Sequence, residues 1–273
     1  MRHPLQPGVA VIVPTHESER TLEACLRSIR GQTVAVNLVV VDNGSRDGTR
    51  TIAARWADHV LESGPERSAQ RNAGMLTSDE AVVGFIDSDM VLEPRVVEEA
   101  VSLMAAGSVG VIVPEYTIGE GYWTRVRAFE RSFYEGSDSI EAARFFAREA
   151  LLRVGGFDED LNAAEDWDLT VRVRALGRVL RTSTRIAHDE GRVRYWSACR
   201  KKGHYASGLR RFQQKYGHRG TKLALDRPYV KRPWLLARNP MLGVGVIALK
   251  AGEATAVAAE LIRRKMHQSH QSN

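Results

Sequence analysis

Short apolar runs alternate with segments of helical periodicity along the first 115 residues. The apolar runs are typical of buried strands, and they are Val9–Val13, Leu38–Val41, His59–Leu61, Ala81–Ile86 and Val109–Val113. The segments between them have the apolar spacing of amphipathic helices, and they are Glu19–Arg30, Thr49–Trp56, Ser68–Met75 and Pro94–Ala106. This alternation predicts an α/β fold built on a mainly parallel sheet with right-handed crossovers.

Beyond Gly121 the alternation gives way to a series of helices. The segments with helical patterns are Tyr122–Glu135, Glu165–Leu176, 195–217 and Met241–Ile262, and Phe145–Val154 is mixed. The last helix is apolar but carries Lys250, Glu253 and Glu260 on one side. Its longest uncharged stretch, Asn239–Leu249, is shorter than the roughly 18–20 apolar residues that a membrane span needs. The pattern favours a helix in a membrane interface over a spanning one. Packing on the domain or at an oligomer contact stays open.

The composition is that of a folded chain. Of the 273 residues, 43% are hydrophobic and 26% are charged, which excludes disorder and fibrous repeats. Two cysteines, Cys25 and Cys199, are too few for a disulfide framework, so we expect the protein to be located in the reducing cytosol. The N-terminus enters a strand-like run without a separate apolar segment, and we expect no signal peptide. The expected location is cytoplasmic, with the inner face of the plasma membrane as an alternative.

The formal net charge of +6 is unevenly distributed. Residues 191–240 hold 14 Lys or Arg and one acid, Asp226, for a local charge of +13, so the rest of the chain carries −7. A concentrated basic block indicates an anionic partner, and nucleic acid, a phosphorylated substrate and a membrane surface all fit. A solvated helical face would have the same composition.

Polar side chains follow the predicted parallel strands, at the edge where α/β sheets bind ligands. They are Thr15, Glu17, Asp42, Asp87 and Asp89. The two carboxylates of Asp87-Ser88-Asp89 repel each other unless a cation or hydrogen-bond donors neutralise them. Oxygen ligands of this kind favour Mg²⁺ or Mn²⁺. The alternative is an ordinary acidic turn.

A second acidic group opens the helix expected at Glu165–Leu176. Glu165, Asp166 and Asp168 suit the positive end of the helix dipole. Three acids around Trp167 exceed that need. A carboxylate beside an aromatic side chain can act as a general base, because partial desolvation raises its pKa.

Taken in order, these motifs resemble family 2 glycosyltransferases, which are inverting enzymes with the GT-A fold. The resemblance covers roughly residues 8–217 and rests on Val11–Glu17, Val40–Thr49, Arg71–Gly74, Asp87–Asp89, Gly155–Asp158 and Glu165–Leu169. It implies a mainly parallel, Rossmann-like sheet with helices on both faces. The glycosyltransferase domain would span 1–220, with a nucleotide-binding half to about 115 and an acceptor half over 116–220. A C-terminal helical extension would occupy 221–273, and membrane contact is one of its expected roles.

The resemblance implies a donor pocket lined by Pro14, Thr15, Glu17, Asp42, Arg71, Asp87 and Ser88. Asp42 would bind the base, usually uracil, and Arg71 would lie near the base or the phosphates. Asp87 would contact the ribose or the donor sugar. Asn43 departs from the family pattern, which often has a second Asp here, and this leaves the base undetermined.

The resemblance also implies the catalytic groups. Asp89, with His188 as a further contact, would hold Mg²⁺ or Mn²⁺ at the donor diphosphate, and Asp166 would be the catalytic base. Asp166 would take the proton of an acceptor hydroxyl that attacks the anomeric carbon, while the metal stabilises the leaving diphosphate. The residues expected near the acceptor are Glu165, Trp167, Lys202 and Tyr205.

The implied partners are a nucleotide-sugar donor and an acceptor that is a sugar, a lipid-linked molecule or a small molecule. Segment 191–265 would meet a membrane surface, or its basic helix would instead bind the donor diphosphate or a phosphate of a lipid acceptor. A homodimer stays open. A nucleic-acid-binding protein would use the basic block but leaves the acidic motifs without a role. A dinucleotide oxidoreductase or a nucleotidyltransferase would have a Gly-rich loop after the first strand, where this chain has Pro14-Thr15-His16.

Overall fold

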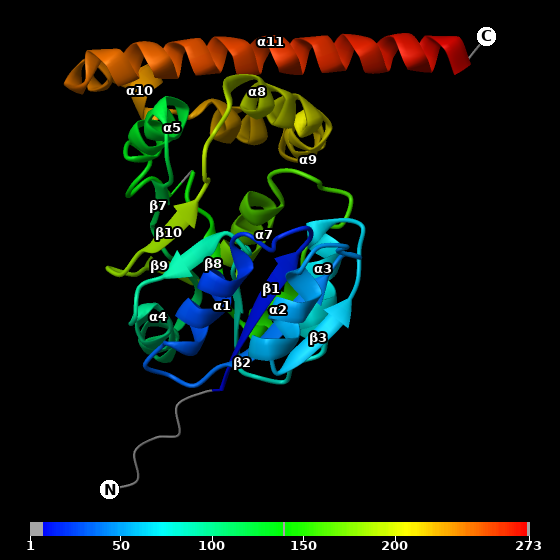
Figure 1. The fold of residues 1–273 in the computed structure, drawn as a ribbon, viewed down its shortest axis with the longest axis vertical. Helices are drawn as coiled ribbons and strands as arrows, with labels where there is room; N and C mark the ends of the chain where they lie inside the picture. Colours follow the sequence, from blue (N-terminus) through cyan, green and yellow to red (C-terminus); the bar gives the residue numbers. More distant parts are fainter. Residues whose placement is uncertain (1–7, 139, 272–273) are drawn as a thin grey trace, which may run out of the picture. The chain divides into compact units, whose positions relative to one another are not determined.

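The structure is a computed structural model that describes residues 8–138 and 140–271. The chain divides into two compact units, which can be followed by colour in Figure 1. The first consists of Met1–Tyr116, Glu141–Glu159 and Glu165–Asp189, and the second of Thr117–Ile140, Asp160–Ala164 and Glu190–Asn273. The chain therefore leaves the first unit and returns to it twice before it ends in the second.

The first unit is built on a seven-stranded sheet in the order β3-β2-β1-β4-β8-β6-β9. Its strands are β1 (Val9–Thr15), β2 (Asn37–Asp42), β3 (His59–Glu62), β4 (Val82–Phe85), β6 (Ser108–Ile112), β8 (Ala143–Ala147) and β9 (Arg178–Arg181). β1 pairs in parallel with β2 and β4, β2 with β3, and β6 with β9, whereas β8 runs antiparallel to both of its neighbours. The prediction of an α/β fold with a mainly parallel sheet is confirmed.

Helices cover both faces of this sheet. They are α1 (Leu22–Arg30), α2 (Thr49–Trp56), α3 (Arg67–Leu76), α4 (Val96–Ala105), α6 (Arg148–Val154) and α7 (Glu165–Arg174). One hydrophobic core joins the sheet to α1, α2 and α4, and a second joins it to α3, α6 and α7. Val11 and Val13 of β1 belong to the first core and Ile12 to the second, because successive side chains of a strand point to opposite faces.

Three short strands form a second sheet in the order β5-β10-β7. They are β5 (Met90–Leu92), β7 (Glu115–Ile118) and β10 (Ile186–Asp189). The apolar pattern does not predict them, because a run of three or four residues is too short to reveal a period of two. The second sheet matters for the site, since Asp89 directly precedes β5 and His188 lies on β10.

Apart from the end of β7, the described elements of the second unit are helical. Its elements are α5 (Tyr122–Arg131), α8 (Tyr195–His204), α9 (Ala206–Leu225), α10 (Pro228–Lys231), the 3₁₀ helix η1 (Pro233–Arg238) and α11 (Pro240–Gln271). The single helix expected at 195–217 is in fact α8 and α9. Tyr205 lies between them with φ −79° and ψ 0°, close to helical values, so the periodicity continues through the junction. α11 packs against α5, α8 and η1, and it is longer than the expected Met241–Ile262.

Gly74 allows α3 to approach the sheet closely. A Cβ at this position would lie 2.5 Å from Cγ2 of Ile12. We therefore expect Gly74→Val to push α3 away from β1 and to lower the free energy of unfolding by about 1–3 kcal/mol. Urea denaturation measures this. Leu76→Val is the matched control, because Leu76 is exposed on the same helix. Equal midpoints for the two variants would contradict the close-approach argument.

Candidate active site

The ends of β1 and β2 form one side of the site. Pro14 and Thr15 are buried at the end of β1, and Thr15 lies beside Asp42 in the strand register. Asp42 is 1% exposed, and its carboxylate accepts hydrogen bonds from the Ser45 N–H at 2.9 Å and the Ser45 hydroxyl at 2.6 Å. Oγ1 of Thr15 is buried and has no hydrogen-bond partner among the described residues.

Glu17, in the loop after β1, binds the loop after β2. Its N–H donates to Oγ of Ser45 at 2.9 Å, and its Oε1 accepts the N–H of Arg46 at 2.8 Å. Glu17 has a φ of 49°, a strained value for a residue with a side chain. These contacts hold the β1 and β2 loops together as one rigid edge.

Arg71 is at the centre of the site. It is fully buried on α3, and its Nη1 donates to Oε1 of Glu165 at 3.1 Å and to Oδ1 of Asp166 at 2.8 Å. Its Nη2 donates to Oδ1 of Asp87 at 2.6 Å. The guanidinium lies 5.0 Å from the centre of the Phe157 ring. One side chain thus joins the acidic motif after β4 to the acidic motif that opens α7.

Two glycine-containing motifs hold Arg71 in place. Nδ2 of Asn72 donates to the carbonyl of Phe157 at 3.0 Å, and the Phe157 N–H donates back to Oδ1 of Asn72 at 2.8 Å. A Cβ on Gly156, whose φ is 69°, would lie 2.6 Å from that oxygen. The Gly155–Asp158 turn is therefore shaped around α3 and presents Phe157 to the arginine.

Arg144 is a second buried arginine in the cluster, and sequence reasoning missed it. Its Nη1 lies 3.5 Å from Oδ2 of Asp87 and 3.6 Å from Oδ2 of Asp166. Its Nε and Nη2 donate to Oε1 of Glu115 at 2.9 and 2.6 Å. The signal in the sequence is a single charged residue inside the apolar strand Ala143–Ala147.

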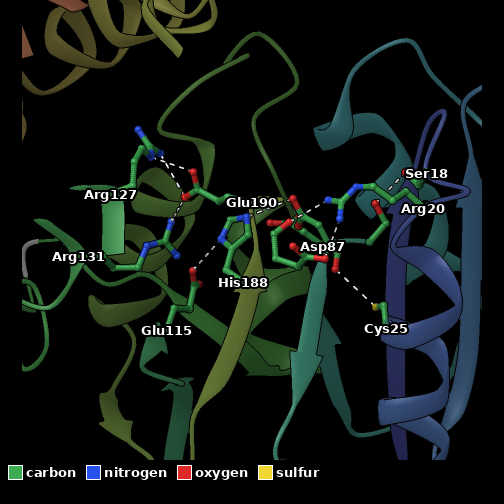
Figure 2. Close-up of polar contacts among 12 residues, drawn as sticks. Ser18, Arg20, Cys25, Asp87, Glu115, Arg127, Arg131, His188 and Glu190 are labelled. Carbon is green, nitrogen blue, oxygen red and sulfur yellow. Dashed lines mark hydrogen bonds and ion pairs between the residues drawn. The ribbon is translucent and has the colours of Figure 1, made fainter. Parts of the chain in front are cut away.

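Glu115 extends the cluster to the residues predicted to bind metal. Nε2 of His188 lies 3.1 Å from Oδ2 of Asp89, and Nδ1 of the same ring lies 3.5 Å from Oε2 of Glu115. Figure 2 shows the imidazole between β10 and Glu115. In the strand register His188 pairs with Met90, the residue after Asp89. Sequence reasoning also missed Glu115, although it follows the apolar strand β6 much as Asp87 follows β4.

Asp89 and His188 fit part of the coordination shell of a divalent cation. No group of three or more His, Cys, Asp or Glu side chains within 8–138 and 140–271 is arranged to hold a metal by itself. A nucleotide-bound Mg²⁺ or Mn²⁺ needs fewer protein ligands, because phosphate oxygens and water supply the rest. One carboxylate oxygen and one imidazole nitrogen, 36% and 19% exposed as side chains, suit that role.

The charges of the cluster are set by burial and by the neighbouring arginines, which include Arg67, paired with Glu165 at 3.2 Å. Burial alone would raise the pKa of Asp87, but the guanidinium groups of Arg71 and Arg144 outweigh it and hold the pKa well below its usual range. Burial and the neighbouring Asp166 raise the pKa of Glu165. Asp87 is therefore a carboxylate at neutral pH, whereas Glu165 binds a proton more readily than an ordinary glutamate.

Accessibility separates the acids of α7. The side chain of Asp166 is 26% exposed, whereas that of Glu165 is 5% exposed. Asp168 is fully buried and pairs with Arg172 at 2.6 Å. Of these three carboxylates, Asp166 is the most exposed.

The remaining predicted residues lie around this cluster or in the other unit. Oγ of Ser88 lies 2.9 Å from Oγ of Ser18, and Trp167 lies in the first turn of α7, half-buried. Lys202 and Tyr205 belong to the second unit, in α8 and directly after it, and their place near the acceptor stays a prediction.

Comparisons with known proteins agree with this architecture. Residues 10–158 match the sequence model of Glycosyl transferase family 2. Glycosyltransferase AglE of Haloferax volcanii is 27% identical over 202 residues, 67% of this chain and 65% of AglE. The pre-mycofactocin glycosyltransferase of Mycobacterium tuberculosis is 27% identical over 72% of this chain and 47% of its own length. The chain thus spans less than two thirds of these relatives.

Two groups of solved structures share the fold at low sequence identity. One is the mannosyltransferase PcManGT of Pyrobaculum calidifontis, in complex with GDP-Man and Mn²⁺, with a TM-score of 0.57, 22% identity and coverage of 98% of this chain and 81% of that one. The other is S. aureus TarS 1–349 in complex with UDP-GlcNAc, with a TM-score of 0.55, 15% identity and coverage of 96% and 92%. The predicted GT-A-like fold and the resemblance to family 2 glycosyltransferases are confirmed.

Proposed function

The chain belongs to Glycosyl transferase family 2, and from this premise we propose that it moves a sugar from a nucleotide-diphosphate sugar to an acceptor hydroxyl with inversion. The observation that carries the proposal is the position of Asp166. It is the accessible carboxylate of its motif, and Arg71 links it directly to Asp87 of the donor motif.

In the proposed reaction Asp166 takes the proton of the acceptor hydroxyl as the acceptor oxygen bonds to the anomeric carbon. The bond from that carbon to the diphosphate breaks on the opposite face, and the electron pair leaves with the diphosphate. Arg71 and Arg144 contact Asp166 from two sides and fix the direction of its carboxylate. Such orientation is a large part of what an enzyme contributes to a displacement.

We propose that Pro14, Thr15, Glu17 and Asp42 border the nucleotide, and that Asp87 and Ser88 contact the ribose or the donor sugar. Among the described residues the Thr15 hydroxyl has no hydrogen-bond partner, which supports this, because a buried hydroxyl without a partner is costly unless a ligand supplies one. Asp42 already accepts two hydrogen bonds from Ser45, and its carboxylate can accept a further one from a base. A uridine base is our proposal for the donor.

We propose that Asp89 and His188 hold Mg²⁺ or Mn²⁺, which when bound would neutralise charge on the departing diphosphate. Asp89→Ala is then expected to weaken donor binding at least about tenfold and to remove its dependence on Mn²⁺. Titration calorimetry with UDP, with and without Mn²⁺, measures both effects. Asp79→Ala is the control, because the Asp79 side chain is fully exposed. Undiminished Mn²⁺ dependence in Asp89→Ala would refute the metal assignment.

A thermal-shift panel of nucleotide sugars tests the function as a whole. A ligand at a hundred times its Kd stabilises the folded state by about 2.7 kcal/mol. We expect a UDP-sugar to raise Tm in the presence of Mn²⁺ and much less in its absence. GDP-sugars belong in the panel because PcManGT is described with GDP-Man. If no nucleotide sugar shifts Tm, the proposal is wrong.

For the acceptor we propose a hydroxyl on a sugar, a polymer or a lipid-linked molecule. A relative named poly(ribitol-phosphate) beta-N-acetylglucosaminyltransferase, TarP of Staphylococcus aureus, is 26% identical over 52% of this chain and 47% of TarP. Its name supports a polymer as one candidate. The proposed acceptor contacts are Glu165, Trp167, Lys202 and Tyr205. The proposed division remains a glycosyltransferase domain over 1–220 and an extension over 221–273.

A further inference from the structure

Two charged side chains of α11, Lys250 and Glu253, face its own unit. Glu253 is 5% exposed, and its carboxylate pairs with Lys250 at 2.8 Å and with Arg127 of α5 at 3.5 Å. Lys250 also pairs with Glu130 of α5 at 2.7 Å, and Glu130 accepts a hydrogen bond from the Tyr229 hydroxyl at 3.3 Å. The inner side of the helix thus carries a buried ionic network.

The opposite side of α11 is apolar and exposed. Its large side chains are 59–68% exposed, and they are Met241, Val244, Ile247, Ile262 and Met266. Ala251 and Ala258 are exposed on the same side, so an apolar stripe runs along most of the helix, the longest in Figure 1. Val246 and Leu249 point the other way, into the small core of the unit.

This arrangement differs from that of a helix with one face in water. Such a helix turns apolar side chains inward and charged ones outward. Here charged groups are buried at a desolvation cost while large apolar groups stay exposed. Exposed apolar patches of this extent mark a surface that another apolar phase covers. The stripe is therefore the part of α11 that needs a partner.

The charge around the stripe identifies the partner. Residues 228–271 contain seven Lys or Arg and two Glu. Glu253 and Lys250 pair in the buried network, Glu260 pairs with Arg263 at 3.1 Å, and Lys231 pairs with Asp226 just before this segment. Arg232 and Arg238 are exposed on either side of Trp234, which is itself 66% exposed. Exposed Trp beside Arg is typical of a lipid headgroup region, and anionic headgroups attract such a basic surface.

Two other ways of burying the apolar stripe fit these observations less well. A second copy of the chain would bring two basic surfaces together, which like-charge repulsion opposes. By length and composition alone Pro240–Arg263 could cross a membrane. A crossing helix would carry its inner ionic network, with Arg127 and Glu130 of α5, into hydrocarbon, at a high desolvation cost.

We infer that the apolar stripe of α11, with Trp234 and the flanking arginines, binds the surface of an anionic lipid bilayer with the helix parallel to the membrane plane. This inference goes beyond the proposed transfer reaction and does not rest on it. Binding to vesicles needs no donor and no acceptor, so the membrane inference and the proposed transfer reaction can be refuted independently.

The test is co-sedimentation of the whole protein with vesicles. We expect binding to phosphatidylcholine mixed with phosphatidylglycerol, weaker binding to phosphatidylcholine alone, and loss of the difference in high salt. Val244→Glu with Ile247→Glu should lower partitioning at least about tenfold. Leu76→Glu, at an equally exposed leucine of the first unit, should not change it. Absence of binding by the unaltered protein, or unchanged binding by the double variant, would overturn the inference.

Further measurements exclude misfolding and the other coverings. Tm from circular dichroism should be the same for the unaltered protein, for Val244→Glu with Ile247→Glu and for Leu76→Glu, because the changed side chains are exposed. If the Val244→Glu, Ile247→Glu variant has a lower Tm than the unaltered protein, the variant Arg232→Glu with Arg238→Glu replaces it. This second variant should weaken binding to vesicles that contain phosphatidylglycerol and should not change binding to phosphatidylcholine vesicles. The protein should sediment as a monomer without lipid and should leave the vesicles in alkaline carbonate. A dimer that Val244→Glu with Ile247→Glu dissociates, or retention in carbonate, would overturn the inference.

Discussion

Asp166→Asn is expected to lower turnover by about a hundred- to ten-thousand-fold, the range that a positioned general base contributes. Asparagine keeps the shape of the side chain and a contact with Arg71, but it cannot take the proton of the acceptor hydroxyl. Donor binding in the presence of Mn²⁺ should stay nearly intact, since Asp166 is proposed to act on the acceptor. Initial rates with the donor from the thermal-shift panel, together with calorimetric donor affinity, measure the two quantities separately.

Two variants give this experiment its controls. Asp79→Asn removes an exposed carboxylate of the same unit and should leave both quantities unchanged. Glu165→Gln changes a buried neighbour that holds Arg71 and should reduce activity less than Asp166→Asn does. An equal loss of transfer and donor binding in Asp166→Asn would remove Asp166 from the role of base.

Arg71→Met is expected to be the most destabilising single change in the site. It would leave Asp87, Glu165 and Asp166 close together without the buried cation that contacts all three, although Arg67 would still pair with Glu165. Removing one partner from a buried ionic cluster typically costs about 3–5 kcal/mol. Arg144 reaches Asp87 and Asp166 only at 3.5 and 3.6 Å, so it compensates in part. Urea denaturation followed by far-UV circular dichroism measures the loss.

The comparison for Arg71→Met is an arginine in an exposed ion pair. Arg50 pairs with Glu62 at 3.2 Å, with side chains 56% and 63% exposed, and Arg50→Met should cost under about 1 kcal/mol. If Arg71→Met does not fold, adding Glu165→Gln should recover part of the stability, because one buried charge is removed. Similar midpoints for Arg71→Met and Arg50→Met would show that the cluster is not held by Arg71.

The motifs of the site were predictable because each lies within a few adjacent residues. Asp87 and Asp89 follow one strand, and Glu165 and Asp166 open one helix, so each pair can be recognised from the adjacent residues in the sequence. Arg144 has no such neighbours. It became part of the site because the antiparallel strand β8 lies between β4 and β6, which brings its guanidinium to acids from three other segments.

The physical reason for the Arg71–Gly74 motif is also visible only in the fold. Gly74 lets α3 meet Ile12 of β1, and Asn72 exchanges two hydrogen bonds with Phe157, more than eighty residues later in the chain. The sequence displays these residues as a pattern. The contact distances explain why Arg71 lies fully buried between them.

The sequence by itself determined the alternation of strands and helices, the mainly parallel sheet and the acidic motifs at its edge. These depend on side-chain spacing within single segments, where the chain itself fixes the distances. Only the tertiary structure decided that Arg71 and Arg144 join the motifs into one cluster. It also decided which side of α11 faces outward. A periodic helix has an apolar and a charged side in its sequence, but the partners on α5 determine that Lys250 and Glu253 of α11 point inward and its apolar stripe outward.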